Sequence, residues 1–159
     1  RRARGPGALL GTLNEELVRL DQPERFVCLL CARVDVREAR VVFANAGITP
    51  PLVCRRGGAV EPIEGGGVLL GVRSGERYPD QAVDLGAGDI VVVHTDGLTE
   101  ATNRSGEEYG ARRLAHVMRG GRGLSPRALG VAVLRDLAAF QDGNPRTDDL
   151  TIVVLRRTA

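Results

Sequence analysis

Two short acidic segments carry the residue types best suited to chemistry in this chain. Asp96 lies shortly after an apolar run at residues 90–93, and Asp148 and Asp149 precede another mostly apolar run at residues 150–155. If these runs are paired antiparallel strands, the end of one lies beside the start of the other, about 5 Å away. Carboxylates gathered at one edge repel each other unless a hard divalent cation neutralises them. The pattern therefore predicts a magnesium or manganese site and metal-assisted chemistry on a phosphate.

The elements that must position these carboxylates follow from turn signals and hydrophobic spacing. Leucines at helical spacing predict a first helix within residues 5–20. The expected elements after it are hairpins at residues 26–45, 52–63 and 81–94, helices at 110–118 and 125–140, and a closing strand at 150–155. The closing strand is mostly apolar, which predicts burial on both of its faces. Hairpins followed by helices and a final strand predict an α+β layered fold.

Composition sets the class of protein. The 159 residues suit a single domain over residues 1–159, and 43% hydrophobic residues can supply its core. All 22 basic residues are arginine, and they are dispersed among acidic residues with a net charge of only +2. No basic stripe emerges, which argues against nucleic acid as the main partner. No apolar run approaches the roughly 20 residues of a membrane span, so we expect no membrane insertion and a cytoplasmic location.

Several segments, in order, resemble one family. They are residues 45–51, 88–103, 106–110 and 147–151. Together they are similar to the bacterial type 2C, metal-dependent serine/threonine phosphatases of the SpoIIE/RsbU-like branch, over residues 9 to 157. The resemblance implies an α-β-β-α sandwich of two antiparallel sheets flanked by helices. It also implies hydrolysis of phosphoserine or phosphothreonine, often on anti-sigma-factor antagonists in bacterial stress or developmental signalling.

The resemblance assigns metal ligands to particular residues of this chain. It implies that Asp96 and Asp148 bind metal, with Asp149 as a less certain neighbour. A complete site of this family holds two manganese or magnesium ions roughly 4 Å apart, which activate a water for attack on phosphorus. No side chain is therefore expected to act as the nucleophile.

Three further residues are expected to support the loop that follows the metal-binding aspartate. Gly97 lets the backbone turn close to the metal, because a side chain there would crowd the site. Glu100 and Asn103 are more naturally organisers of this loop than substrate ligands. His94 ends a run of core valines and is expected to be a partly buried strand residue rather than a general acid.

The chain departs from the family at two places. The family's first metal motif is an aspartate-glycine pair followed by a glycine-histidine-glycine turn, and nothing in residues 1–11 matches it. We therefore expect a domain that is N-terminally incomplete relative to the family, or a diverged member. Ile48 also stands where the family usually has histidine.

Two functional classes stay open. The first is a phosphatase that acts on a phosphorylated protein, with room for an upstream sensor domain and a homodimer. The alternative is a non-catalytic pseudophosphatase or interaction module that binds a phosphoprotein or a sensor partner.

Overall fold

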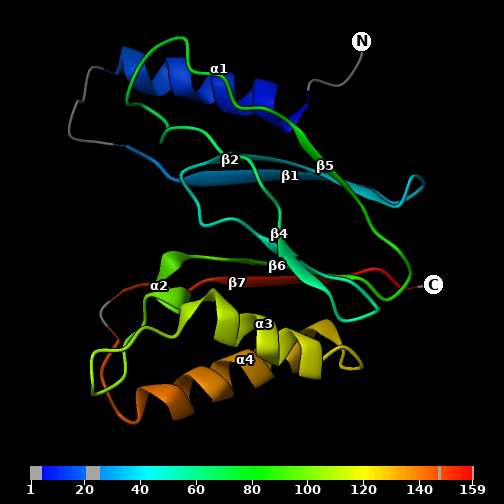
Figure 1. Cartoon of the computed structure of the whole chain (residues 1–159). Helices are drawn as coiled ribbons and strands as arrows, with labels where there is room; N and C mark the ends of the chain where they lie inside the picture. Colours follow the sequence, from blue (N-terminus) through cyan, green and yellow to red (C-terminus); the bar gives the residue numbers. More distant parts are fainter. Residues whose placement is uncertain (1–4, 21–25, 147, 159) are drawn as a thin grey trace. The chain divides into compact units, whose positions relative to one another are not determined.

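The computed structural model describes residues 5–20, 26–146 and 148–158, which form two compact units (Figure 1). The first unit comprises Arg1–Pro50 and Ile63–Leu85, and the second comprises Pro51–Pro62 and Gly86–Ala159. Each unit contains one antiparallel sheet with at least one helix packed on it. The predicted α+β class, with two antiparallel sheets flanked by helices, is therefore confirmed. The single domain expected over residues 1–159 stays a prediction.

The first unit packs one helix on a three-stranded sheet. Its elements are α1 (Pro6–Arg19), β1 (Leu29–Asp35), β2 (Arg40–Ala46) and β5 (Gln81–Asp84). The strand order is β1-β2-β5, and the predicted hairpin of β1 with β2 is present. Leu10 of α1 is fully buried against Ala44 and Ala46 of β2, together with Leu70 and Tyr78.

Two glycines of α1 are expected to respond in opposite directions to replacement. A Cβ at Gly7 would overlap the backbone carbonyl oxygen of Tyr78, whereas a Cβ at Gly11 would meet nothing within 4 Å. We expect Gly7→Ala to lower the free energy of unfolding by about 2 kcal/mol through this overlap. Gly11→Ala should raise it by about 0.5–1 kcal/mol, because alanine is the better helix former. Urea denaturation of both variants measures the difference, and similar shifts for the two would contradict this packing of α1.

The second unit packs its helices against a four-stranded sheet. Its strands are β3 (Leu52–Cys54), β4 (Val60–Pro62), β6 (Ile90–His94) and β7 (Ile152–Arg156), in the order β4-β3-β6-β7. Its helices are α2 (Asp96–Thr99), α3 (Gly110–Gly120) and α4 (Pro126–Gln141). In Figure 1, α3 and α4 lie together on one face of this sheet. The core between helices and sheet includes Leu52, Val92, Leu114, Leu129 and Val133.

Polar and aromatic side chains join α3 to α4. The Arg113 guanidinium donates to both carboxylate oxygens of Asp136, at 2.8 and 3.2 Å, and Tyr109 Oη donates to the same carboxylate at 2.8 Å. The guanidinium also lies 4.9 Å from the centre of the Phe140 ring. Because an Arg–carboxylate fork fixes both distance and orientation, this cluster sets how the two helices pack.

The start of α4 follows the sequence prediction. Ser125 Oγ accepts a hydrogen bond from the backbone N–H of Ala128 at 3.2 Å, and Pro126 occupies the first helical position. Serine at the cap satisfies a backbone donor that the first turn leaves free, and proline has no N–H to lose there. The helix ends where Asp142 adopts a left-handed conformation, with φ of 46°.

Two strand predictions were wrong. The expected hairpin over residues 81–94 does not form: β5 pairs with β2, whereas β6 pairs with β3 and β7. Because β3 and β7 occupy the two sides of β6, no edge of β6 is left for β5. The closing strand β7 was expected to be buried on both faces, yet Val153 is 46% exposed. β7 is an edge strand of the described sheet, so its neighbours cover it less than they cover β6.

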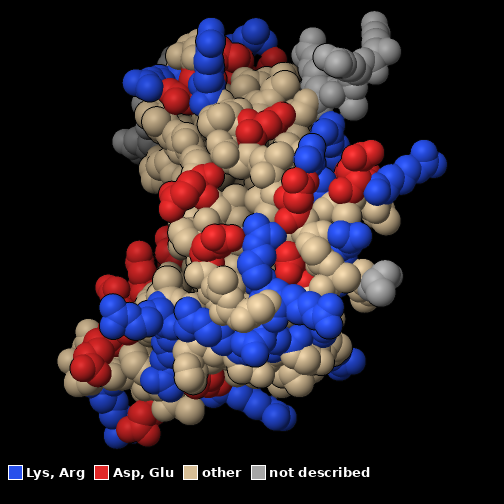
Figure 2. Space-filling view, turned by 45° about the vertical axis from the view of Figure 1, so that its right-hand side comes forward, with Lys and Arg blue, Asp and Glu red and all other residues tan. Residues whose placement is uncertain are grey.

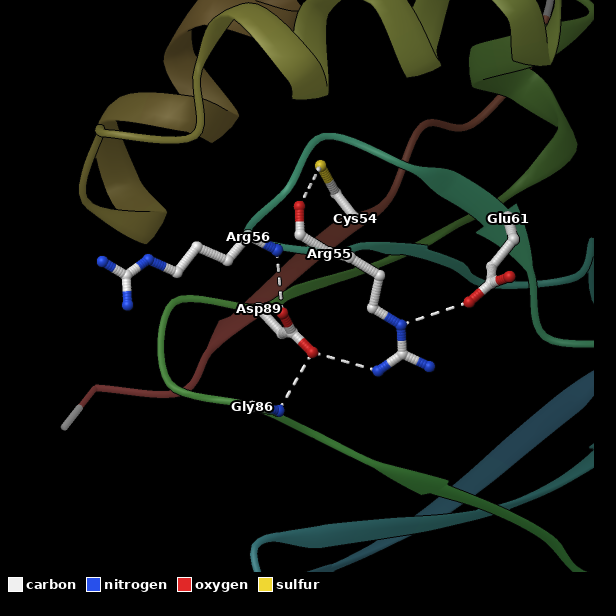
Figure 3. A network of polar contacts seen from close by, with 6 residues as sticks. All are labelled: Cys54, Arg55, Arg56, Glu61, Gly86 and Asp89. Atoms are coloured by element: carbon white, nitrogen blue, oxygen red, sulfur yellow. Dashed lines mark hydrogen bonds and ion pairs between the residues drawn. The ribbon is translucent and has the colours of Figure 1, made fainter.

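A buried carboxylate fixes the turn that leads into β6 (Figure 3). Asp89 is only 5% exposed and accepts hydrogen bonds from the backbone N–H groups of Arg56 at 2.8 Å and Gly86 at 2.9 Å. Arg55 Nη1 donates to it at 3.0 Å, while Arg55 Nε donates to Glu61 at 3.1 Å. Burial raises the pKa of Asp89, but these three donors outweigh burial and hold that pKa below its usual value of 3.8. The turn before β6 and the turn after β3 are therefore joined through one ionised side chain.

Within the described residues, no helix is both long and apolar enough to cross a lipid bilayer.

Candidate functional site

The two acidic segments meet where β6 ends and β7 begins. His94 pairs with Ile152 in the antiparallel register, so the chain leaving β6 runs beside the chain entering β7. Thr95 joins the two segments. Its backbone N–H donates to the Thr151 carbonyl at 3.2 Å, its hydroxyl accepts from the Thr151 N–H at 3.0 Å, and the same hydroxyl donates to the Asp149 carbonyl at 3.2 Å. These hydrogen bonds bring the segment of Asp96 and the segment of Asp148 and Asp149 together at one edge of the sheet, where β6 ends and β7 begins. This edge is called the rim below.

Gly97 allows the closest approach between these segments. A Cβ at this position would overlap the carbonyl oxygen of Asp149, and it would lie 3.1 Å from the carbonyl carbon of Asp149 and 3.5 Å from the Cβ of Asp148. Gly97 lies within the short helix α2, whose backbone conformation any residue can adopt. A glycine is therefore needed here only because a side chain would not fit. The chain therefore turns immediately against the opposite acidic segment. That Gly97 also lets the backbone pass close to a metal stays a prediction.

The carboxylates of the rim are exposed and partly oriented. Asp96 Oδ1 accepts from the Gly97 N–H at 3.0 Å, and Asp148 Oδ1 accepts from the Asp149 N–H at 2.7 Å. Each of these two carboxylates thus keeps its other oxygen without a partner among the described residues. Carboxylate oxygens are the donors that magnesium and manganese prefer, so Asp96 and Asp148 fit such an ion in kind. They do not make a full ligand set: in residues 5–20, 26–146 and 148–158 no three acidic, histidine or cysteine side chains converge.

His94 lies in the core beneath this rim. It is 1% exposed, its Nδ1 lies 3.1 Å from the Thr95 carbonyl oxygen, and its Nε2 has no partner in the described part of the chain. Burial lowers the pKa of His94, against smaller opposing contributions from the Thr95 carbonyl and the charge of Asp96. The imidazole is therefore neutral near pH 7 and sits too deep to exchange protons with a ligand at the rim.

A small cavity of about 230 Å³ opens beside Asp148. Its lining includes Gly97, Glu100, Gln141 and Arg146, of which only Arg146 is basic. Gln141 is 5% exposed, and its Nε2 donor has no partner among the described residues. A buried donor without an acceptor is costly, so the Gln141 amide is an unsatisfied polar group within the described residues beside this cavity.

The two predicted loop residues lie close to the rim in different ways. Glu100 caps α2, its N–H donating to the Asp96 carbonyl at 2.8 Å, and its side chain is exposed at the cavity. Asn103 Oδ1 accepts from the N–H groups of Ser105 and Glu107, both at 3.0 Å, and its Nδ2 donates to Glu107 Oε2 at 2.8 Å. Asn103 thus closes its own loop, and none of its hydrogen bonds within the described residues reaches Asp96 or Asp148.

Sequence reasoning missed three residues at this site. Thr95 joins the two acidic segments, Gln141 lines the cavity, and Asn144 Nδ2 donates to the Thr102 carbonyl at 2.9 Å, which ties the chain after α4 to the loop after α2. Only Thr95 carried a signal, since a threonine precedes the aspartate in both acidic segments. Thr147, which belongs to the second motif, lies outside the described residues, as do residues 1–4 of the stretch without a first metal motif.

Ile48 lies in the first unit, in a turn held by one side chain. Its N–H donates to Asn45 Oδ1 at 2.9 Å, and Asn45 Nδ2 donates to the Ile48 carbonyl at 2.7 Å. Both bonds use backbone atoms of residue 48. These two hydrogen bonds therefore do not depend on the side chain at position 48.

The chain matches a known family over almost its whole length. The family model described as Stage II sporulation protein E (SpoIIE) matches residues 1–158. Among curated proteins, the chain is 21% identical over 132 residues to protein IcfG of a Synechocystis strain. That match covers 83% of this chain but only 21% of IcfG.

Solved structures share the fold. The SiaA-PP2C domain of Pseudomonas aeruginosa matches with a TM-score of 0.83 and 26% identity, over 96% of this chain and 61% of that domain. The phosphatase domain of SpoIIE from Bacillus subtilis, soaked with manganese, matches with a TM-score of 0.69 and 21% identity, over 96% of this chain and 65% of the other. This chain thus spans less than two thirds of either structure.

Proposed function

We propose, because this chain belongs to the SpoIIE family of PP2C-type phosphatase domains, that it takes part in metal-dependent hydrolysis of phosphoserine or phosphothreonine in a protein. The observation that supports this most directly is the meeting of Asp96 and Asp148 at the facing ends of β6 and β7. Two carboxylates at one rim, each with an oxygen that has no partner among the described residues, suit a divalent cation better than they suit any other common ligand.

Each residue of the rim has a distinct role in this proposal. Asp96 and Asp148 would hold magnesium or manganese, with Asp149 as a further carboxylate at the same edge. The chemistry that two such bound ions supply is polarisation of the phosphate and activation of water. Thr95 and Gly97 keep the two segments together, and the Arg146 guanidinium, which lines the cavity beside Asp148, can pair with phosphate oxygens.

The substrate and setting are proposed on the resemblance alone. We propose a phosphorylated protein, with an anti-sigma-factor antagonist as the first class to test, in the cytoplasm and under an upstream sensor domain. A homodimer is tested in the same preparation by light scattering.

Asp148→Asn tests the proposed activity. The purified chain is given a phosphoserine protein, and phosphate release is measured with manganese and again after chelation. We expect release that needs manganese and falls by about 100-fold or more in Asp148→Asn, since metal activation of the water is lost. Asp142→Asn, which neutralises an exposed aspartate at the end of α4, is the matched control and should keep full activity. Release that ignores manganese, or that survives in Asp148→Asn, would rule out this site.

One observation favours the alternative, a pseudophosphatase that only binds its partner. The described residues supply two oriented carboxylates rather than a converging group of three. The two functions separate cleanly in one further measurement. If the folded chain releases no phosphate but binds a phosphoprotein equally well before and after Asp148→Asn, the interaction module is the better description.

A further inference from the structure

A second site lies in the same unit at the other end of β6. A hollow of about 740 Å³ is lined by the arginines Arg56, Arg122, Arg156 and Arg157. They come from the turn after β3, the connection between α3 and α4, and the end of β7. No aspartate or glutamate lines this hollow. Asp96 lies just after the C-terminal end of β6, whereas Gly88, which lines this hollow, lies just before the N-terminal end of β6. The two sites are therefore separated by the length of the strand.

Three of these arginines contact the backbone around them, Arg56 through its stem and the other two through their guanidinium groups. The stem of Arg56 lies over Gly88, where a Cβ would come 3.4 Å from Arg56 Cδ. Arg122 Nη1 would lie 2.7 Å from a Cβ at Gly58, so that guanidinium rests on the turn between β3 and β4. Arg156 Nη1 donates to the Leu124 carbonyl at 2.5 Å. Side chains restrained in this way lose less entropy when they bind a ligand.

Three arginines of this hollow lack the ion pairs that other arginines of the unit form. Arg55, Arg104 and Arg113 each form ion pairs with aspartate or glutamate. In contrast, no acidic group of the described residues lies within ion-pair distance of Arg56, Arg122 or Arg156. Figure 2 shows arginine side chains forming a band across the unit that holds α3 and α4. Like charges gathered in this way oppose folding, so the cluster is better explained by a ligand than by stability.

We propose that this hollow is a docking site for an acidic segment of a partner protein. The arginine fork matches a carboxylate in two hydrogen bonds, and several forks at one hollow suit several neighbouring carboxylates. The first turn of α4, which begins at Pro126, also lines the hollow and adds the partial positive charge of a helix N-terminus. No aromatic side chain lines it, so single-stranded nucleic acid would lack the stacking surface that it usually finds. The site goes beyond the proposed phosphatase activity and does not depend on it.

Binding of a fluorescein-labelled oligoglutamate peptide to the full chain tests this site by fluorescence anisotropy. We expect binding that weakens as salt rises, because exposed charges are screened. Arg56→Gln combined with Arg122→Gln should weaken it by about tenfold or more at low salt. Arg112→Gln combined with Arg135→Gln removes the same charge from exposed positions outside the hollow and should change binding by less than about twofold.

Two further readouts separate docking from damage to the fold. The Arg56/Arg122 variant should melt at the same temperature as the parent or slightly higher, because like-charge repulsion is relieved. Where the parent hydrolyses p-nitrophenyl phosphate, the variant should do so at the same rate, since neither arginine lies at the rim. If peptide binding weakened equally in the Arg112/Arg135 control, binding would depend only on the net charge of the protein, and the proposed site would be wrong. Tighter binding of an oligonucleotide than of the peptide, or no peptide binding at low salt, would overturn the proposal.

Discussion

Gly97→Ala is expected to lower the free energy of unfolding by about 2 kcal/mol, because the new methyl group overlaps a backbone carbonyl that cannot rotate away. The overlap can be relieved only by moving α2 and the segment of Asp148 and Asp149 apart. A displacement of about 1 Å at a reacting centre can cost about 100-fold in rate, so we expect manganese-dependent phosphate release to fall by that order. Urea denaturation and the phosphate assay measure the two effects on the same preparation.

Gly120→Ala is the matched control for this change. Gly120 also lies in a helix, α3, but a Cβ there would meet nothing within 4 Å. We expect it to leave activity unchanged and to change stability by less than about 1 kcal/mol, in the stabilising direction. If Gly97→Ala behaved like this control in both assays, the two acidic segments would not be in contact.

Asp89→Asn is expected to destabilise the chain by about 3 kcal/mol at neutral pH, because a buried, paired charge is removed from its donors. The amide NH₂ would face the N–H groups that now donate to the carboxylate, and the Arg55 guanidinium would lose its buried partner. Glu61→Gln makes the same chemical change in the other, exposed partner of Arg55 and should cost less than about 1 kcal/mol. Chemical denaturation of both variants compares a buried with an exposed carboxylate on one arginine.

The pH dependence of Asp89→Asn has a definite sign. Since the folded-state pKa of Asp89 is below its usual value, its charge contributes stability that is fully present above that usual value. The contribution is lost as pH falls through the folded-state pKa. The gap in unfolding free energy between parent and variant should therefore be constant around neutral pH and shrink in acid. A gap that widened in acid would mean that the carboxyl is buried in its neutral form.

Local patterns were enough to predict most elements of the fold. Ser125 and Pro126 signalled the start of α4, and short turns signalled the hairpins of β1 with β2 and β3 with β4. The pairing of β5 could not be read in the same way. A short turn after Gln81–Asp84 looks like a hairpin, but the partner is chosen by which strand edges are still unpaired, and that depends on distant segments.

The residues of the candidate site also differ in whether local sequence patterns could predict them. Asp96, Gly97 and Asp148 were identified because they flank apolar runs, and antiparallel pairing then brings them together. Gln141 lies at the end of a helix and reads as an ordinary polar residue, yet the chain after it buries its amide at the cavity. The arginine hollow is invisible for a related reason: its members are far apart in sequence and only the fold collects them.

The two compact units are interleaved along the chain, which constrains how the protein is made. The second unit takes its β3–β4 hairpin from residues between β2 and β5 of the first. On the ribosome, the β3–β4 hairpin must therefore wait for β6, which pairs with β3 and is synthesised later, while its apolar side chains stay exposed to solvent and to chaperones. The interleaving also means that neither unit can be excised as one continuous segment. Dissection by truncation should yield insoluble fragments, whereas a rearranged chain that moves residues 51–62 to follow residue 85, so that residue 50 joins 63 and residue 62 joins 86, would give each unit an uninterrupted segment.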